Sequence, residues 1–176
     1  MWIGGTALIV GLVAVVFFNN PAIRGVPEGA EHVDVAAPQH VEGDLHADGE
    51  VPAGGPHDEI WQNCGYYDVE VRSENAVHSL EHGAVWITYE PGLAEDQLRQ
   101  LRGFTQGPDK VLVSPIAGQD SAIIVTAWAN QCELADAGDA RPAQLVNEFE
   151  ASLDATRTRR PLQRRHRHPC VLRKGR

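Results

Sequence analysis

Apolar and polar residues follow regular patterns mainly in the second half of the chain, where they predict four strands. Residues 66–71 largely alternate, and residues 84–89 are β-branched and aromatic, the composition that strands favour. Residues 110–113 and 122–128 lie on either side of a turn and complete the set. Because the segment 122–125 is apolar on both faces, we expect it to be a central strand.

Apolar residues recur at helical spacing in the same half of the chain. Residues 93–104 place leucines on one side, with acidic residues early and arginines late, and residues 142–153 begin at a proline. A brief third helix is expected through the histidine motif, capped by Ser73 or Asn75 and ended by Gly83. The order of the elements predicts an α+β fold, with a small mixed or antiparallel sheet and two helices on one face.

The segment between residues 19 and 56 has no such regularity. Its prolines and glycines interrupt any helix or strand, so we interpret it as a linker followed by an irregular arm. Two short alternating pieces within it, residues 31–35 and 39–42, are candidates for edge strands.

The apolar run from Trp2 to Phe18 predicts a transmembrane helix ahead of this domain. Its seventeen residues, at about 1.5 Å each, span roughly 25 Å, near the short end for a membrane-spanning helix. A cleaved secretory signal is the alternative. However, no Lys or Arg precedes the run, and Asn19-Asn20-Pro21 is not a small-residue cleavage site. We therefore expect a single-pass protein of the cell membrane, with its domain on the extracytoplasmic side.

Charge is distributed unevenly along the chain. Nine of the fifteen Lys and Arg residues follow Thr156, whereas no acidic residue follows Asp154. The first 156 residues therefore hold six basic and twenty-four acidic residues, which argues against nucleic-acid binding and allows attraction of cations. No protein partner is indicated. We divide the chain into an anchor (1–20), a linker (21–37), an α+β domain (38–154) and a basic disordered tail (155–176).

The three cysteines suggest one disulfide. In an oxidising compartment Cys64 and Cys132, both inside the domain, are the expected pair, and Cys170 is left over. That bond would contribute about 3–4 kcal/mol in the chain-entropy model. A role of Cys64 as a metal ligand is the competing interpretation.

Two histidines and a carboxylate occur within five positions, at His78, Glu81 and His82. On a helix these residues share a face, so both imidazoles could bind one metal ion with Glu81 beside them. Certain zinc peptidases have this order, with the glutamate as general base, but on longer helices. On a strand the two histidines would lie about 13 Å apart and could not share one ion.

Histidines are also dense in the preceding segment, since six of the eight lie between His32 and His82. His57 follows Gly54-Gly55-Pro56, a turn that could present its ring rigidly. Imidazole suits copper and zinc, whereas a single methionine argues against a Met-rich Cu(I) carrier. The sequence predicts a Cu or Zn site formed by His57, His78 and His82 with His40. The alternative is that these histidines are structural or lie on the surface.

Several motifs carry a family resemblance. They are His40-Val41-x-Gly43, Gly55-Pro56-His57, Cys64-Gly65-x-Tyr67, the block from Glu74 to Val85, Tyr89-x-Pro91 and Ala127-Trp128. Together they resemble the bacterial proteins catalogued as domain of unknown function 3105, over roughly residues 38–153. The resemblance implies one N-terminal membrane anchor and one extracytoplasmic domain, and brings no established activity. The chain departs from the family at residues 51–54, Val-Pro-Ala-Gly in place of Pro-Pro-Thr-Ser, and in its arginine-rich tail.

Three functions are compatible with these residues. The first is metal binding by an extracytoplasmic domain that is not an enzyme. The second is a non-catalytic interaction module of the cell envelope, in which the His-Glu-His segment is a structural corner. The third is a zinc hydrolase that uses Glu81 as its base. Donor atoms that share one metal should lie within about 3–4 Å of each other, so the positions of His57, His78 and His82 discriminate among them.

Overall fold

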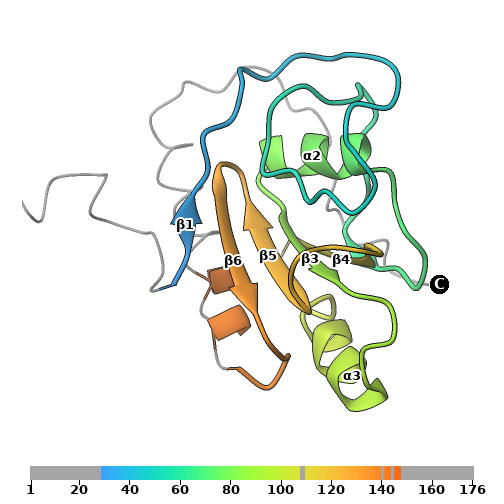
Figure 1. Ribbon diagram of the computed structural model, residues 1–176, viewed down its shortest axis with the longest axis vertical. Helices are drawn as coiled ribbons and strands as arrows, with labels where there is room; N and C mark the ends of the chain where they lie inside the picture. Colours follow the sequence, from blue (N-terminus) through green and yellow to red (C-terminus); the bar gives the residue numbers. More distant parts are fainter. Residues whose placement is uncertain (1–28, 108–109, 140, 144, 148–176) are drawn as a thin grey trace, which may run out of the picture.

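A six-stranded mixed sheet forms the centre of the domain (Figure 1). The computed structural model describes residues 29–107, 110–139, 141–143 and 145–147. The strand order across the sheet is β1-β6-β5-β3-β4-β2. The strands are β1 (Glu31–His32), β2 (Gly65–Tyr66), β3 (Val85–Tyr89), β4 (Val111–Pro115), β5 (Ile123–Ala127) and β6 (Asn130–Leu134).

Both parallel and antiparallel pairs occur in this sheet, as expected for a mixed α+β fold. β3 runs parallel to β4, and β4 runs parallel to β2. Parallel neighbours need a crossover connection, and helix α3 (Glu95–Gly103) supplies the one between β3 and β4. β5 pairs antiparallel with β3 and β6. The predicted central strand is confirmed, because β5 lies between these two neighbours.

Alternate residues of the strands separate the core into two clusters, one on each face of the sheet. On one face, Ile87 and the strand residues that point the same way form a cluster with Leu101 of α3. Leu145, from the helical segment near the end of the described chain, belongs to the same cluster. Trp86 faces the other side, where it packs against Leu80 of helix α2 (Ser73–Glu81). Two helical segments therefore share one face as predicted, and the third helix covers the opposite face.

One predicted strand is shorter than expected, one strand was not predicted, and one predicted helix is described only in part. The strand expected over 66–71 is only two residues long, because the chain leaves the sheet and exposes Val69. β6 was not predicted, since its polar residues resemble a loop, yet it pairs with β5 along its whole length. Residues 141–143 and 145–147 are helical, and the remainder of the helix expected over 142–153 lies outside the described residues.

The predicted Cys64–Cys132 disulfide is wrong. Cys132 is a buried free thiol on β6, and burial raises its pKa. Cys64 directly precedes β2, at the other edge of the sheet. Four strand spacings separate β6 from β2, about 19 Å, whereas a disulfide joins Cα atoms less than about 7 Å apart.

The predicted anchor (1–20) and tail (155–176) lie outside the described residues. Within the ranges that are described, no helix is long and apolar enough to cross a membrane.

Candidate metal site

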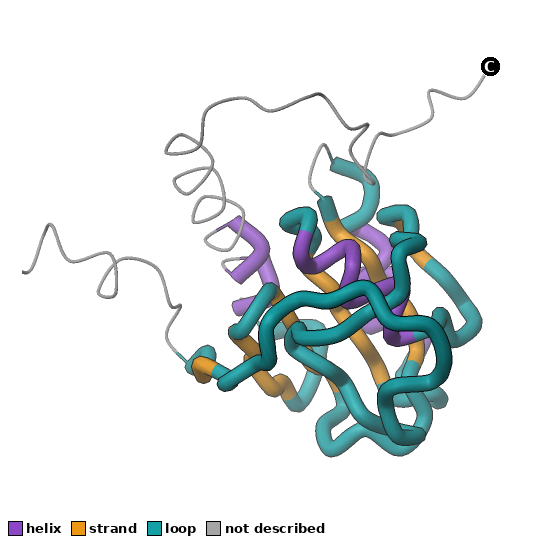
Figure 2. Tube along the Cα trace, turned by 90° about the horizontal axis from the view of Figure 1, so that it is seen from above, coloured by secondary structure: helices purple, strands orange, loops and turns teal. Residues whose placement is uncertain are grey.

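Residues 33–64, called the arm below, connect β1 to β2 and wrap around α2 without forming a regular element of their own (Figures 1 and 2). Loops longer than about 15 residues are uncommon in compact domains and are usually functional. The turn between β5 and β6 fixes the arm, because the backbone N–H of Ala129 donates to the carbonyl of Ala53 at 2.8 Å. The arm is therefore a positioned structure that passes over the helix carrying the histidine motif.

His57 is held rigidly at the middle of the arm. Gly54 and Gly55 adopt positive φ angles, and a Cβ atom on Gly54 would lie 3.2 Å from the Trp128 ring. This close approach lets the loop pack on Trp128 and bury His57 completely. The Nδ1–H of His57 donates to the carbonyl of Gly55 at 2.8 Å, because a carbonyl oxygen can only accept. The orientation of the ring is therefore fixed by its own turn.

His40 reaches the site because its segment of the arm pairs with the backbone of His57. The N–H of His57 donates to the carbonyl of Gln39 at 2.9 Å, and the N–H of Val41 donates to the carbonyl of His57 at 2.8 Å. This isolated parallel bridge places the two imidazole centroids 5.2 Å apart. His40 remains on the exposed side of the site.

Helix α2 supplies the other half of the site from its last turn. His78, Glu81 and His82 stand at i, i+3 and i+4, so they share one face as predicted. Gly83, with a φ of 85°, ends the helix by donating its N–H to the carbonyl of Leu80 at 2.9 Å. The Nδ1–H of His78 donates to the carbonyl of Asp58 at 2.8 Å, which ties this ring to the arm.

These elements bring four potential ligands together. One donor atom from each of His40, His57, His78 and Glu81 lies within 4.8 Å of all the others. Between the arm and the helix, Nε2 of His57 lies 3.3 Å from Oε2 of Glu81. Three of the four predicted metal-binding histidines are therefore in this group, and Glu81 takes the place expected for His82.

His82 lies at the edge of this group. Its Nε2 atom is 3.0 Å from Nε2 of His78, and their ring centroids are 4.8 Å apart. In the neutral state Nδ1 of His78 carries the hydrogen, so Nε2 of His82 is the donor of this hydrogen bond. A metal ion bound to His78 would replace that hydrogen.

The electrostatics of the cluster favour the neutral form of His78. Burial lowers the pKa of His78, and the neighbouring His82, His57 and His40 lower it further, although the bond to Asp58 opposes the shift. The Nε2 atom of His57 is buried and has no hydrogen-bond partner. In the neutral ring, whose Nδ1 carries the hydrogen, a lone pair of Nε2 points into the cluster, towards the carboxylate of Glu81.

Trp61 forms an aromatic wall beside the cluster. Its ring lies 5.8 Å from both the His78 and the His82 rings.

His32 and His46, which contributed to the histidine density, lie outside the cluster. The nearest carboxylates are Asp34, 3.9 Å from His32, and Glu50, 3.5 Å from His46.

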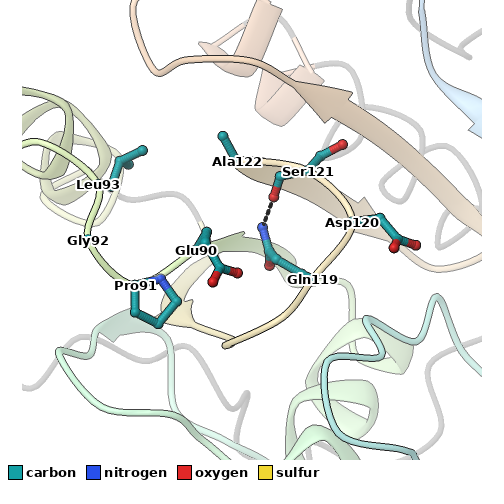
Figure 3. A pocket seen from close by; sticks show the side chains of 8 residues that line it. All are labelled: Glu90, Pro91, Gly92, Leu93, Gln119, Asp120, Ser121 and Ala122. Carbon is teal, nitrogen blue, oxygen red and sulfur yellow. Dashed lines mark hydrogen bonds between the residues drawn. The ribbon is translucent and has the colours of Figure 1, made fainter.

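A separate open hollow of about 410 Å³ lies beyond the other end of β3 (Figure 3). Residues 90–93 and 119–122 line it, and the side chain of Gln119 donates to the carbonyl of Ser121 at 2.6 Å. His82 precedes β3 and Glu90 follows it, so about 17 Å of strand separates the hollow from the histidine cluster. The two features share no residue.

Comparison with known families agrees with the motifs. The family described as protein of unknown function (DUF3105) matches residues 40–162, well over half of the chain. The chain therefore belongs to this family, as its histidine motifs indicated. No curated protein and no solved structure matches the chain.

Proposed function

We propose that this domain binds one transition metal ion, Cu(II) or Zn(II), through His40, His57, His78 and Glu81. The observation that carries the proposal is the pair formed by Nε2 of His57 and Oε2 of Glu81. With His57 in its neutral form, two electron-rich atoms face each other at 3.3 Å, and the nitrogen is buried without a hydrogen-bond partner. Buried polar groups of this kind need a compensating partner, and a cation would satisfy both atoms at once.

The surroundings of the imidazoles match those of metal ligands. Histidines that bind metals commonly donate their second ring N–H to a carbonyl or carboxylate, which fixes the tautomer and the ring orientation. His57 does so to Gly55, and His78 does so to Asp58. Both rings therefore present Nε2 lone pairs to the same space before any metal is bound.

The donor set limits the identity of the metal. Imidazole and carboxylate suit Zn(II) and Cu(II), whereas Cu(I) favours thiolate and thioether ligands. Met1 is the only methionine in the chain, and Cys132 lies in the core on the opposite face of the sheet. The group of four donors therefore supports a divalent ion that is intermediate between hard and soft, such as Zn(II) or Cu(II).

The separations among the donors indicate how the site would close. Bonds of 2.0–2.1 Å in a tetrahedral site bring ligand atoms to about 3.4 Å from each other. The donor atoms lie within 4.8 Å of one another, so the most widely separated pair would need to approach by up to about 1.4 Å. The rings of His57 and His78 are fixed by backbone carbonyls, and the exposed His40 and the partly exposed Glu81 are the groups free to move. His82 would release its hydrogen bond to His78.

We further propose that the domain works on the extracytoplasmic side of the cell membrane, held by residues 1–20. The apolar run at Trp2–Phe18 supports this placement. A hydrolase is less well supported, because Glu81, the base it would need, lies among the ligands themselves.

Metal binding by the full-length protein tests the proposal. The purified protein, stripped with a chelator and titrated calorimetrically with Zn(II) or Cu(II), should bind one equivalent at micromolar affinity or tighter. The variants His57→Ala and His78→Ala should each weaken binding at least tenfold. His32→Ala is the matched control, because His32 is exposed on β1 and outside the cluster.

Equal affinities in all four proteins, or no binding by the wild type, would overturn the proposal. The competing interpretation, a structural corner, makes a different prediction. In that case His78→Ala would lower the melting temperature equally with and without metal, and metal would not stabilise the wild type.

A further inference from the structure

Arg72 connects all three parts of the chain that form the histidine cluster. It occupies the N-cap position of α2, two turns before the ligands on that helix. Its Nη2 donates to the carbonyl of Gly43 at 2.9 Å, and its Nη1 donates to Oδ2 of Asp58 at 3.1 Å. Weaker ion pairs join it to Asp44 at 3.6 Å and to Glu74 at 3.5 Å. One guanidinium therefore bridges two separate segments of the arm and the helix.

The two residues to which Arg72 donates hydrogen bonds lie within three residues of a proposed ligand. Gly43 lies three residues after His40, on the segment that pairs with His57. Asp58 follows His57 directly, and its own carbonyl accepts the hydrogen bond from His78. Displacing Asp58 would therefore disturb two of the three imidazoles.

The chemistry of arginine explains why a single side chain can do this. The guanidinium is planar and presents a fixed fork of donors, so it can satisfy a carbonyl and a carboxylate simultaneously. Lysine carries a point charge that does not reproduce the fork. Because about half of the Arg72 side chain is exposed, its ion pairs contribute little to overall stability. We therefore expect Arg72 to affect the positions of the ligands more than the free energy of unfolding.

We infer that Arg72 is a positioning residue of the metal site, which sets the arm at the distance from α2 at which His40 and His78 bind the same ion. This inference rests on the function proposed above. It assigns Arg72 no contact with the metal.

The experiment measures Cu(II) affinity by competition with a chelator on the full-length protein, because Cu(II) binds nitrogen and oxygen sites tightly among first-row divalent ions. Arg72→Ala should weaken binding about 10–100-fold, the range seen when the partners of metal ligands are removed. Arg72→Lys should fall between Arg72→Ala and the wild type. Addition of millimolar guanidinium should restore part of the affinity of Arg72→Ala.

A spectroscopic measurement separates positioning from folding. Electron paramagnetic resonance of the copper-loaded protein should show fewer coordinated nitrogens in Arg72→Ala than in the wild type, at a temperature where both retain native circular dichroism. Should Arg72→Ala fail to fold, Arg72→Lys carries the same test. Arg102→Ala is the matched control, because Arg102 is similarly exposed and bonds to Glu95 and Tyr66 on the other face of the sheet.

The outcomes separate the two proposals. Wild-type binding with an unchanged affinity and spectrum in both Arg72 variants would overturn the role of Arg72 and leave the metal site standing. A wild type that binds no copper would overturn both. Equal losses in the Arg72 and Arg102 variants would contradict a specific positioning role.

Discussion

Nε2 of His57 and Oε2 of Glu81 lie 3.3 Å apart, although one belongs to the arm and the other to α2. In its neutral state the ring of His57 donates its only hydrogen to Gly55, so both facing atoms are then acceptors. The side chain of His57 is 1% exposed, whereas that of Glu81 is 36% exposed. The buried Nε2 of His57 can therefore be satisfied by a proton or a cation that enters beside the exposed carboxylate of Glu81.

Replacing the carboxylate should separate metal binding from stability. In Glu81→Gln an amide N–H can donate to Nε2 of His57, which relieves the unsatisfied acceptor. We expect the metal-free melting temperature to stay constant or rise by about 3 °C, as about 1 kcal/mol would produce. Zn(II) affinity should fall at least tenfold because a charged ligand is lost. Calorimetry of the metal-free and metal-loaded variant checks both, and unchanged affinity would remove Glu81 from the ligand set.

Gly54 should tolerate no side chain. Its φ of 150° and a Cβ position 3.2 Å from the Trp128 ring both oppose alanine. Gly54→Ala should cost about 1–3 kcal/mol in unfolding free energy and weaken metal binding, because the turn presents His57. Gly103→Ala on α3 is the control.

At Gly103 a Cβ atom meets nothing within 4 Å, so alanine should be neutral or stabilise by up to about 1 kcal/mol. Urea denaturation measures both variants. Equal effects at the two glycines would contradict the packing described for the arm.

Glu74 links the arm to the first turn of α2 and should make the domain acid-sensitive. Burial alone would raise the pKa of Glu74, but backbone N–H groups, including that of Leu45, and the charge of Arg72 bring the pKa below its ordinary value. A carboxylate whose folded pKa is lowered stabilises the fold above its unfolded pKa of about 4.3, and this stability is lost as pH falls through the folded value.

Urea midpoints measured from pH 6 to pH 3 should therefore fall more steeply for the wild type than for Glu74→Gln. The variant should already be less stable at pH 6, by about 1–3 kcal/mol, because a buried charged acceptor is lost. Parallel curves for the two proteins would show that Glu74 does not contribute in this way.

Cys132 should behave as a protected thiol. It is buried on β6 and its pKa is raised by burial, so iodoacetamide at pH 8 should leave it unmodified in the native protein. After unfolding in urea without a reductant, peptide mapping should find it alkylated. Alkylation that required prior reduction would show that Cys132 forms a disulfide after all.

The sequence predicted the elements that carry a strong local signal. The run 84–89 became β3 and the histidine motif became the last turn of α2, because β-branched composition and a glycine stop act locally. Three members of the donor group were also predicted, since histidine is rare and its clustering is visible along the chain. The helical spacing of Glu81 was visible as well, but its place in the donor group was not.

The remaining features depend on contacts between distant residues. Nothing local indicates that Gln39 and Val41 pair with His57, or that this pairing carries His40 into the site. The disulfide prediction failed for the same reason, because the strand order that separates Cys64 from Cys132 is a property of the whole sheet. Glu81 rather than His82 completes the group because the arm approaches that side of α2.

Anomalous diffraction from crystals of the full-length protein soaked in Zn(II) or Cu(II) tests the metal site most directly. We predict one strong peak at the absorption edge of the metal, about 2.0–2.2 Å from Nε2 of His57 and within bonding distance of His78 and Glu81. No peak between the arm and α2, or a peak only at exposed residues such as His32, would contradict the proposed site.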